Sequence, residues 1–126
     1  MSKKILVAED SSVIQNLTRR ILSLQNYKIS SVKNGAQVLE LLNKEPFDLV
    51  LLDIHMPIMD GMECAQEIRK LPKDMNGAIP IIAITGNANN YSEDEFKRVG
   101  IDYFLPKPLN YDTLVETVNS FMTNGN

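Results

Sequence analysis

Three short, uninterrupted apolar runs constrain the fold of this chain more than any other feature of its sequence. They occupy residues 5–8, 49–52 and 81–84, and Ile, Leu and Val dominate them. Runs of this length are typical of strands buried on both faces, as in a parallel sheet covered by helices on both sides. Two weaker candidates, residues 28–32 and 103–105, bring the number of predicted strands to five.

Helical periodicity fills most of the chain between these runs. Apolar side chains recur every three or four residues, which predicts one apolar stripe per helix, facing the sheet. The stripes are Val13, Leu17, Ile21 and Leu24; Ala36, Leu39 and Leu42; Met62, Ala65 and Ile68; and Leu114, Val118 and Phe121. Ser92 and Glu95 form a capping box for one more helix over residues 92–99, and Gly100 follows its predicted end.

Strictly alternating strands and helices predict an α/β fold. Five parallel strands and five helices fit a flavodoxin-like, doubly wound sheet in three α/β/α layers, and by analogy with that fold we expect the strand order 2-1-3-4-5. Capping residues precede three of the helices: Ser11 or Ser12, Asn34 and Asn110. Residues 71–80 are rich in Pro, Asn and Gly, including the Asn76-Gly77 pair, and predict a surface loop.

Length and composition indicate one globular domain over residues 1–126. We expect its core over about residues 3–122 and a frayed tail over residues 123–126. A hydrophobic content of 44% with 23% charged residues excludes a disordered chain, and the net charge of −3 argues against a nucleic-acid partner. The initiating Met and the polar tail favour a free-standing chain over a piece of a larger regulator.

The single cysteine, Cys64, rules out an internal disulfide and is expected to be a buried thiol. The apolar run near the start is too short and too quickly followed by acidic residues for a signal peptide. No apolar stretch approaches the roughly 18 residues of a membrane span. These features predict a cytoplasmic protein with no membrane partner.

Charged and hydroxyl side chains directly follow four of the predicted strands. In open α/β sheets ligands bind beyond the carboxyl ends of the strands, so we expect these groups to converge at one edge. They are Glu9 and Asp10, Asp53, Thr85 with Gly86, and Lys107.

This group of residues has the chemistry of a phosphoryl-transfer site. Three carboxylates in one pocket repel one another, and a hard divalent cation with oxygen ligands, such as Mg²⁺, is the natural compensation. The ammonium, the hydroxyl and the N–H groups of the turn suit a phosphoryl group. Asp53, central in the sheet, is the best-placed carboxylate to accept it.

Taken in order, these motifs resemble the receiver domain family of response regulators, the chemotaxis-regulator-like proteins of two-component signal transduction. The resemblance covers about residues 3–122. Its parts are Glu9-Asp10, Asp53-Ile54-His55-Met56-Pro57-Ile58-Met59-Asp60-Gly61, Ile84-Thr85-Gly86 and Lys107-Pro108.

The resemblance implies a phosphoacceptor and a metal site. Asp53 would accept a phosphoryl group from a phosphohistidine on a histidine kinase or a histidine phosphotransfer protein. Glu9, Asp10 and Asp53, with the backbone carbonyl of His55, would hold Mg²⁺. The domain would catalyse only its own phosphorylation and dephosphorylation, so it would not be an enzyme acting on other substrates.

The same resemblance assigns the phosphoryl contacts and the switch. Thr85, Lys107 and the backbone N–H groups of Ile54 and Gly86 would contact the phosphoryl oxygens. Thr85 and Phe104 would form the switch, although Phe104 lacks the hydroxyl of the Tyr often found there and would act through packing alone. The peptide bond that follows Lys107 is expected to be cis.

Signalling is expected at one surface of the domain. The resemblance places it on the helix over residues 92–99, the strand over residues 103–105 and the last helix. A downstream protein target would bind there.

Three alternative functions stay open from the sequence. A flavodoxin of similar topology would need a phosphate-binding loop after the first strand, where Glu9 and Asp10 would repel the flavin phosphate. A phosphatase with an aspartyl nucleophile would need a second carboxylate at position 55, which is His. A degenerate receiver would act only as a binding module. A zinc site at His55 is disfavoured because the chain has no second His.

Overall fold

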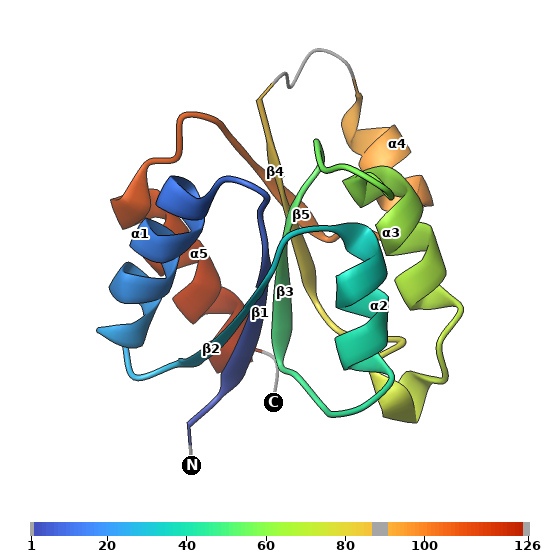
Figure 1. The fold of residues 1–126 in the computed structure, drawn as a ribbon, viewed down its shortest axis with the longest axis horizontal. Coiled ribbons are helices and arrows are strands. Elements are labelled where there is room, and N and C mark those ends of the chain that lie inside the picture. Colours follow the sequence, from blue (N-terminus) through green and yellow to red (C-terminus); the bar gives the residue numbers. More distant parts are fainter. Residues whose placement is uncertain (1, 87–90, 125–126) are drawn as a thin grey trace.

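Five parallel strands form one sheet through the middle of the molecule, between two layers of helices (Figure 1). They are β1 (Lys4–Ala8), β2 (Lys28–Val32), β3 (Leu49–Asp53), β4 (Ile81–Thr85) and β5 (Tyr103–Pro106). The computed structural model describes residues 2–86 and 91–124. The strands pair in the order β2-β1-β3-β4-β5, so the predicted flavodoxin-like fold and strand order are confirmed.

Helices cover both faces of the sheet and complete the three layers (Figure 1). One face carries α1 (Ser12–Ser23) and α5 (Tyr111–Asn124), and the other carries α2 (Gly35–Leu42), α3 (Gly61–Arg69) and α4 (Glu93–Arg98). A 3-10 turn, η1 (Lys73–Met75), lies inside the predicted surface loop. Among the helices that the structure describes, none combines the length and apolar character that crossing a lipid bilayer requires.

Burial on both faces explains why the apolar runs are unbroken. All five residues of β3 and all five of β4 are buried. Neighbouring side chains go to opposite cores: Leu52 packs in the core shared with α2, α3 and α4, and Leu51 in the core shared with α1 and α5. Cys64 is buried as predicted, and burial raises the pKa of its thiol to about 12.

Helix starts lie where the capping residues predict them. The side chains of Ser11, Asn34 and Asn110 accept hydrogen bonds from the first turns of α1, α2 and α5. Ser92 and Glu95 form the predicted capping box of α4. These contacts join residues three positions apart, so they can be read from a short stretch of sequence.

The apolar stripe of α1 does not face the sheet, contrary to the prediction. Val13, Leu17 and Leu24 are 78%, 42% and 76% exposed. The buried residues of this helix are Thr18 and Leu22.

Polar contacts at the start of α1 set its rotation. The Gln15 side-chain amide donates to the backbone carbonyls of Glu9 (3.1 Å) and Val32 (2.8 Å), next to the ends of β1 and β2. These bonds hold the Gln15 side of the helix against the sheet. Thr18 and Leu22, three and seven residues further on, fall on the same face, and the apolar stripe lies on the opposite one.

Two smaller differences concern α2 and α5. The buried residues of α2 are Gly35, Val38 and Leu42, while Ala36 of the predicted stripe is exposed. The last helix continues to Asn124, two residues into the segment predicted to be a frayed tail. Residues 125–126 of that predicted tail lie outside the described residues.

Truncation of two leucines tests the observed rotation of α1. Leu22→Ala should lower the free energy of unfolding by roughly 2–5 kcal/mol, because this side chain is fully buried. Leu24→Ala removes the same atoms from a side chain that is 76% exposed, and should change the free energy of unfolding by less than about 0.5 kcal/mol. Urea denaturation measures both, and equal losses would show that the helix is rotated differently.

Candidate functional site

The carboxyl ends of four neighbouring strands bring the predicted site residues to one edge of the sheet. In the sheet, β1, β3, β4 and β5 are consecutive neighbours. The structure thus places side by side the strand ends that carry Glu9 and Asp10, Asp53, Thr85, and Lys107.

Three carboxylates form an acidic cluster at this edge. One carboxylate oxygen from each of Glu9, Asp10 and Asp53 lies within 4.8 Å of the others. Asp53 is fully buried and Glu9 is 3% exposed, whereas Asp10 is exposed. Negative charges so close together, two of them buried, repel one another, so the cluster requires positive charge.

Lys107 supplies part of that positive charge. Its Nζ lies 3.0 Å from Oδ2 of Asp53 and 3.8 Å from Oε1 of Glu9. The Lys107 N–H donates to the carbonyl of Thr85 (2.8 Å), which extends the pairing of β4 and β5 by one residue. The Lys107–Pro108 peptide bond is cis, as predicted. One ammonium group therefore faces two buried carboxylates and leaves an excess of negative charge.

Of the two buried carboxylates, Glu9 has the less closely compensated charge. Its Oε2 accepts a hydrogen bond from the Ser11 N–H (3.0 Å), whereas the buried Oε1 accepts none from the residues that the structure describes. Burial is the main cause that raises the pKa of Glu9 to about 7; the Asp53 charge adds to the rise, while the Ser11 N–H and Lys107 oppose it. A buried oxygen that accepts no hydrogen bond, beside two more carboxylates, is a donor set that fits a hard divalent cation.

The loop after β3 orients the Asp53 carboxylate. Its Oδ1 accepts a hydrogen bond from the His55 N–H (3.0 Å). The Ile54 N–H, predicted to contact phosphoryl oxygens, donates instead to the Ile84 carbonyl (3.0 Å). The sheet pairing continues one residue past β3 and occupies this donor, so His55, not Ile54, turns its backbone N–H toward the acidic cluster.

Gly61 is a residue of the site whose role the sequence analysis missed. A Cβ at this position would lie 2.7 Å from the Asp53 carbonyl oxygen and 2.7 Å from Cα of Ile54. The Gly61 N–H also donates to the Ile54 carbonyl (2.9 Å). Glycine therefore lets α3 lie directly on the Asp53 backbone. The available signal was a glycine, a poor helix former, at the first position of a helix that Asp60 caps.

The remaining predicted residues lie on β4 and β5 or next to them. Thr85 is 1% exposed, and Gly86 is exposed, with room for a Cβ at 3.7 Å from Cδ of Lys107. Phe104 is half-buried and stacks on Phe96 of α4, with 4.9 Å between the ring centroids and 27° between the ring planes. Phe104 thus joins β5 to α4.

Sequence comparison relates this chain to signalling proteins. It matches the response regulator receiver domain family over residues 5–119. It is 34% identical over 123 residues to hybrid signal transduction histidine kinase I of Dictyostelium discoideum, a match that covers 94% of this chain and 7% of that protein. The polar-differentiation response regulator DivK of Brucella anthropi is 27% identical over 122 residues, which cover 97% of this chain and 98% of DivK. The chain spans only 5–10% of the length of four histidine kinases that it matches.

A solved structure shares the same architecture over nearly the whole chain. The receiver domain of the sensor histidine kinase PA1611 from Pseudomonas aeruginosa, with a magnesium ion coordinated in its active-site cleft, is 27% identical with a TM-score of 0.88. The likeness covers 98% of this chain and 100% of that one. Because the sequence match and the structural likeness both extend over most of its length, the chain belongs to the response regulator receiver domain family, the phosphoacceptor switches of two-component and phosphorelay signalling.

Proposed function

We propose that Asp53 accepts a phosphoryl group from a phosphohistidine of a donor protein. The observation that carries this proposal is its fully buried carboxylate, 3.0 Å from the Lys107 ammonium in a cluster with excess negative charge. In the transfer, a bond forms between a carboxylate oxygen and phosphorus. The phosphorus–nitrogen bond to the donor histidine breaks, and its electron pair returns to the imidazole.

Mg²⁺ would be held by Glu9, Asp10, Asp53 and the backbone carbonyl of His55. The short separations within the acidic cluster and the absence of a hydrogen bond to the buried Oε1 of Glu9, among the described residues, support the three carboxylates as ligands. When bound, the ion would offset the charge of the carboxylates and of the phosphoryl oxygens. The similar PA1611 receiver domain has magnesium in its cleft.

The phosphoryl oxygens would be bound by Lys107, the Thr85 hydroxyl and the backbone N–H of Gly86. The Lys107 ammonium already bonds to the Asp53 carboxylate and would remain paired with the group that replaces it. These residues would promote only the phosphorylation of Asp53 and its later hydrolysis. The chain would therefore act as a switch and not on other substrates.

An exposed apolar surface beside the site supports a protein as the donor. The Val13, Leu17 and Leu24 stripe runs along α1, which begins two residues after Asp10. A hollow of about 440 Å³ next to it is lined by Ile14, Lys107, Pro108, Leu109 and Tyr111. Exposed apolar side chains that lie together on a surface are typical of protein-binding sites. A histidine kinase or a histidine phosphotransfer protein would dock along α1 and present its phosphohistidine to Asp53.

The signalling surface would lie on α4, β5 and α5. Ring contacts with centroids 4.9–6.4 Å apart form a continuous aromatic chain across these elements: Tyr91, Phe96, Phe104, Tyr103 and Phe121. Such rings suit a protein target, whereas a net charge of −3 does not suit nucleic acid.

Thr85 and Phe104 would connect the site to that surface. Thr85 ends β4, and a shift of its side chain toward a phosphoryl group would move the strand end that leads to α4. Phe104 stacks on Phe96 of α4, so the stack would change when α4 moves. A target that prefers one arrangement would select it.

Phosphorylation of two aspartate variants tests the acceptor. Incubation with acetyl phosphate and Mg²⁺ should add the mass of one phosphoryl group to the wild type and none to Asp53→Asn, because the amide is no nucleophile. Asp112→Asn removes an exposed carboxylate from the start of α5 and should react like the wild type. Intact-protein mass spectrometry measures the product, and wild-type labelling of Asp53→Asn would refute the assignment.

The pH dependence of stability tests the state of Glu9 without metal. Its pKa is about 7 in the folded protein and near the ordinary value of 4.5 in the unfolded chain. Between these pH values the folded state therefore binds more protons than the unfolded state. The free energy of unfolding should therefore fall as pH rises through this window, by up to roughly 3 kcal/mol from this group. Glu9→Gln has no carboxyl group to titrate at this position, so its free energy of unfolding should fall less over the same pH range.

Urea denaturation at both ends of that pH window gives the comparison. Added Mg²⁺ should restore stability at the upper end in the wild type and much less in Glu9→Gln, because the ion replaces the proton as the positive charge. Parallel pH profiles of the two proteins would contradict this account of Glu9.

Chemical-shift mapping tests the connection to the signalling surface. Beryllofluoride, a phosphoryl mimic, should shift amide resonances at His55 and also in α4 and β5. In Phe104→Ala the shifts in α4 should shrink while those at His55 persist, because only the ring stack is lost. Shifts confined to the surroundings of Asp53 in the wild type would show that the site and the surface are not connected.

A further inference from the structure

The Asn76–Gly77 pair forms a turn that few residue types fit. Asn76 has a φ of 74° and a ψ of 2°, in the left-handed region that Gly and Asn adopt most readily. A Cβ at position 77 would lie 2.1 Å from the carbonyl oxygen of Leu71. The turn after η1 therefore favours Asn or Gly at position 76 and requires Gly at position 77.

The Asn76 side chain fastens the segment between α2 and β3. Its Nδ2 donates to the carbonyls of Leu42 (2.7 Å) and Glu45 (2.8 Å), and its Oδ1 accepts from the Phe47 N–H (3.1 Å). Both amide hydrogens and the amide oxygen are used. Gly at position 76 would fit the turn but lose all three bonds, so this link specifically requires Asn.

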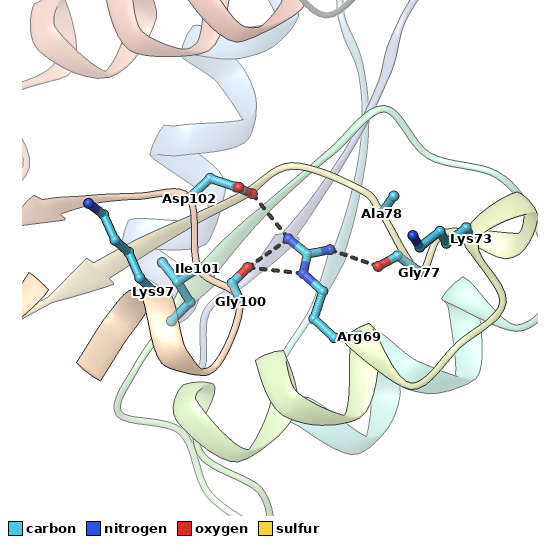
Figure 2. A pocket seen from close by; sticks show the side chains of 8 residues that line it. All are labelled: Arg69, Lys73, Gly77, Ala78, Lys97, Gly100, Ile101 and Asp102. Atoms are coloured by element: carbon cyan, nitrogen blue, oxygen red, sulfur yellow. Dashed lines mark hydrogen bonds and ion pairs between the residues drawn. The ribbon is translucent and has the colours of Figure 1, made fainter. Parts of the chain in front are cut away.

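Gly77, the next residue of the turn, is held by hydrogen bonds through its own backbone N–H and carbonyl. Its N–H donates to the Pro72 carbonyl (2.9 Å), and its carbonyl accepts from Nη1 of Arg69 (3.0 Å). Figure 2 shows the Arg69 guanidinium between Gly77 on one side and Gly100 and Asp102 on the other, where Nε and Nη2 donate to the Gly100 carbonyl. The turn is thus tied to α3 and to the start of β5.

Asn followed by Gly is also the pair in which asparagine deamidates most readily, because glycine has no side chain to shield its backbone nitrogen. The Gly77 nitrogen would attack Cγ of Asn76; a carbon–nitrogen bond forms, the side-chain carbon–nitrogen bond breaks, and ammonia leaves. Water then opens the cyclic imide to aspartate or isoaspartate. In the fold the attacking nitrogen is bound to Pro72, and the leaving amide is bound to Leu42 and Glu45, which opposes the reaction.

We propose that Asn76 is a deamidation site that the native fold protects and unfolding exposes, and that its conversion impairs refolding. An ionised aspartate has no hydrogen to donate, so the oxygen that replaces Nδ2 would face the carbonyls of Leu42 and Glu45 without a hydrogen bond. Isoaspartate would also add a carbon to the backbone of a turn with no spare room. A chain converted to aspartate at position 76 therefore lacks two of the three hydrogen bonds that link the turn to the α2–β3 segment.

The same dipeptide at Asn34–Gly35 provides an internal contrast. Asn34 caps α2, and its Oδ1 accepts from the Gln37 N–H (2.9 Å). Aspartate at this position keeps the acceptor and adds a favourable negative charge at the start of a helix. A third pair, Asn124–Gly125, reaches outside the described residues and is followed as a separate peptide in the test.

Deamidation of the wild-type chain tests the protection directly. The protein is incubated in mildly alkaline buffer, either folded or in urea, and peptide mapping follows aspartate and isoaspartate at each Asn-Gly pair. Conversion at Asn76 should be at least about tenfold slower in the folded protein, because it requires local opening. After dilution from urea, the unrefolded fraction should be enriched in chains converted at position 76. Equal rates with and without urea would overturn the proposal.

Two aspartate variants test the consequence of conversion. Asn76→Asp should lower the Tm by roughly 10 °C, since it loses two donors. Asn34→Asp should shift it by less than about 2 °C. If Asn76→Asp does not fold well enough to purify, the refolding yield of the converted wild type answers the same question. A wild-type Tm for Asn76→Asp, or full refolding of converted chains, would show that conversion is harmless.

Discussion

A carboxylate buried completely at the end of the central strand sets the conditions for the rest of this structure. Burial of Asp53 is unfavourable unless a cation and hydrogen-bond donors replace its water. Lys107 and the His55 N–H, both at 3.0 Å, do so. Oε1 of Glu9 lies 3.8 Å from the same Lys107 ammonium, so one lysine offsets the charge of two buried carboxylates. The shortage of positive charge is built into the site, and a divalent cation would relieve it.

The packing beneath the site holds this unfavourable arrangement in place. Every residue of β3 is buried, so the strand that carries Asp53 is fixed by both cores. Gly61 lets the start of α3 lie against the Asp53 backbone. Its N–H donates to the Ile54 carbonyl and so joins the two ends of the loop between β3 and α3. Such constraints explain how electrostatic repulsion persists at a functional site: apolar burial elsewhere in the domain offsets it.

Sequence patterns predicted the strands, the helix caps and the edge where the site lies, because each depends on residues close in sequence. They did not predict the rotation of α1. Periodicity identifies an amphipathic helix, but the bonds from Gln15 to the carbonyls of Glu9 and Val32 decide which face meets the sheet. The Ile54 N–H was misassigned for a related reason, since its partner, Ile84, belongs to another strand. The need for glycine at the start of α3 is likewise a tertiary contact.

The shared ammonium also explains how a change at Asp53 could reach a distant surface. A phosphoryl group on Asp53 would add negative charge next to Lys107, and this ammonium would then have less positive charge to offer Glu9. Glu9 would depend more on a bound cation, so occupancy by phosphoryl and by cation would favour each other. The Lys107 backbone is tied to the Thr85 carbonyl at 2.8 Å, so its movement would be felt by both β4 and β5. Phe104 lies on β5, three residues before Lys107, and stacks on Phe96 of α4, so this ring links the strand that leads to Lys107 with α4.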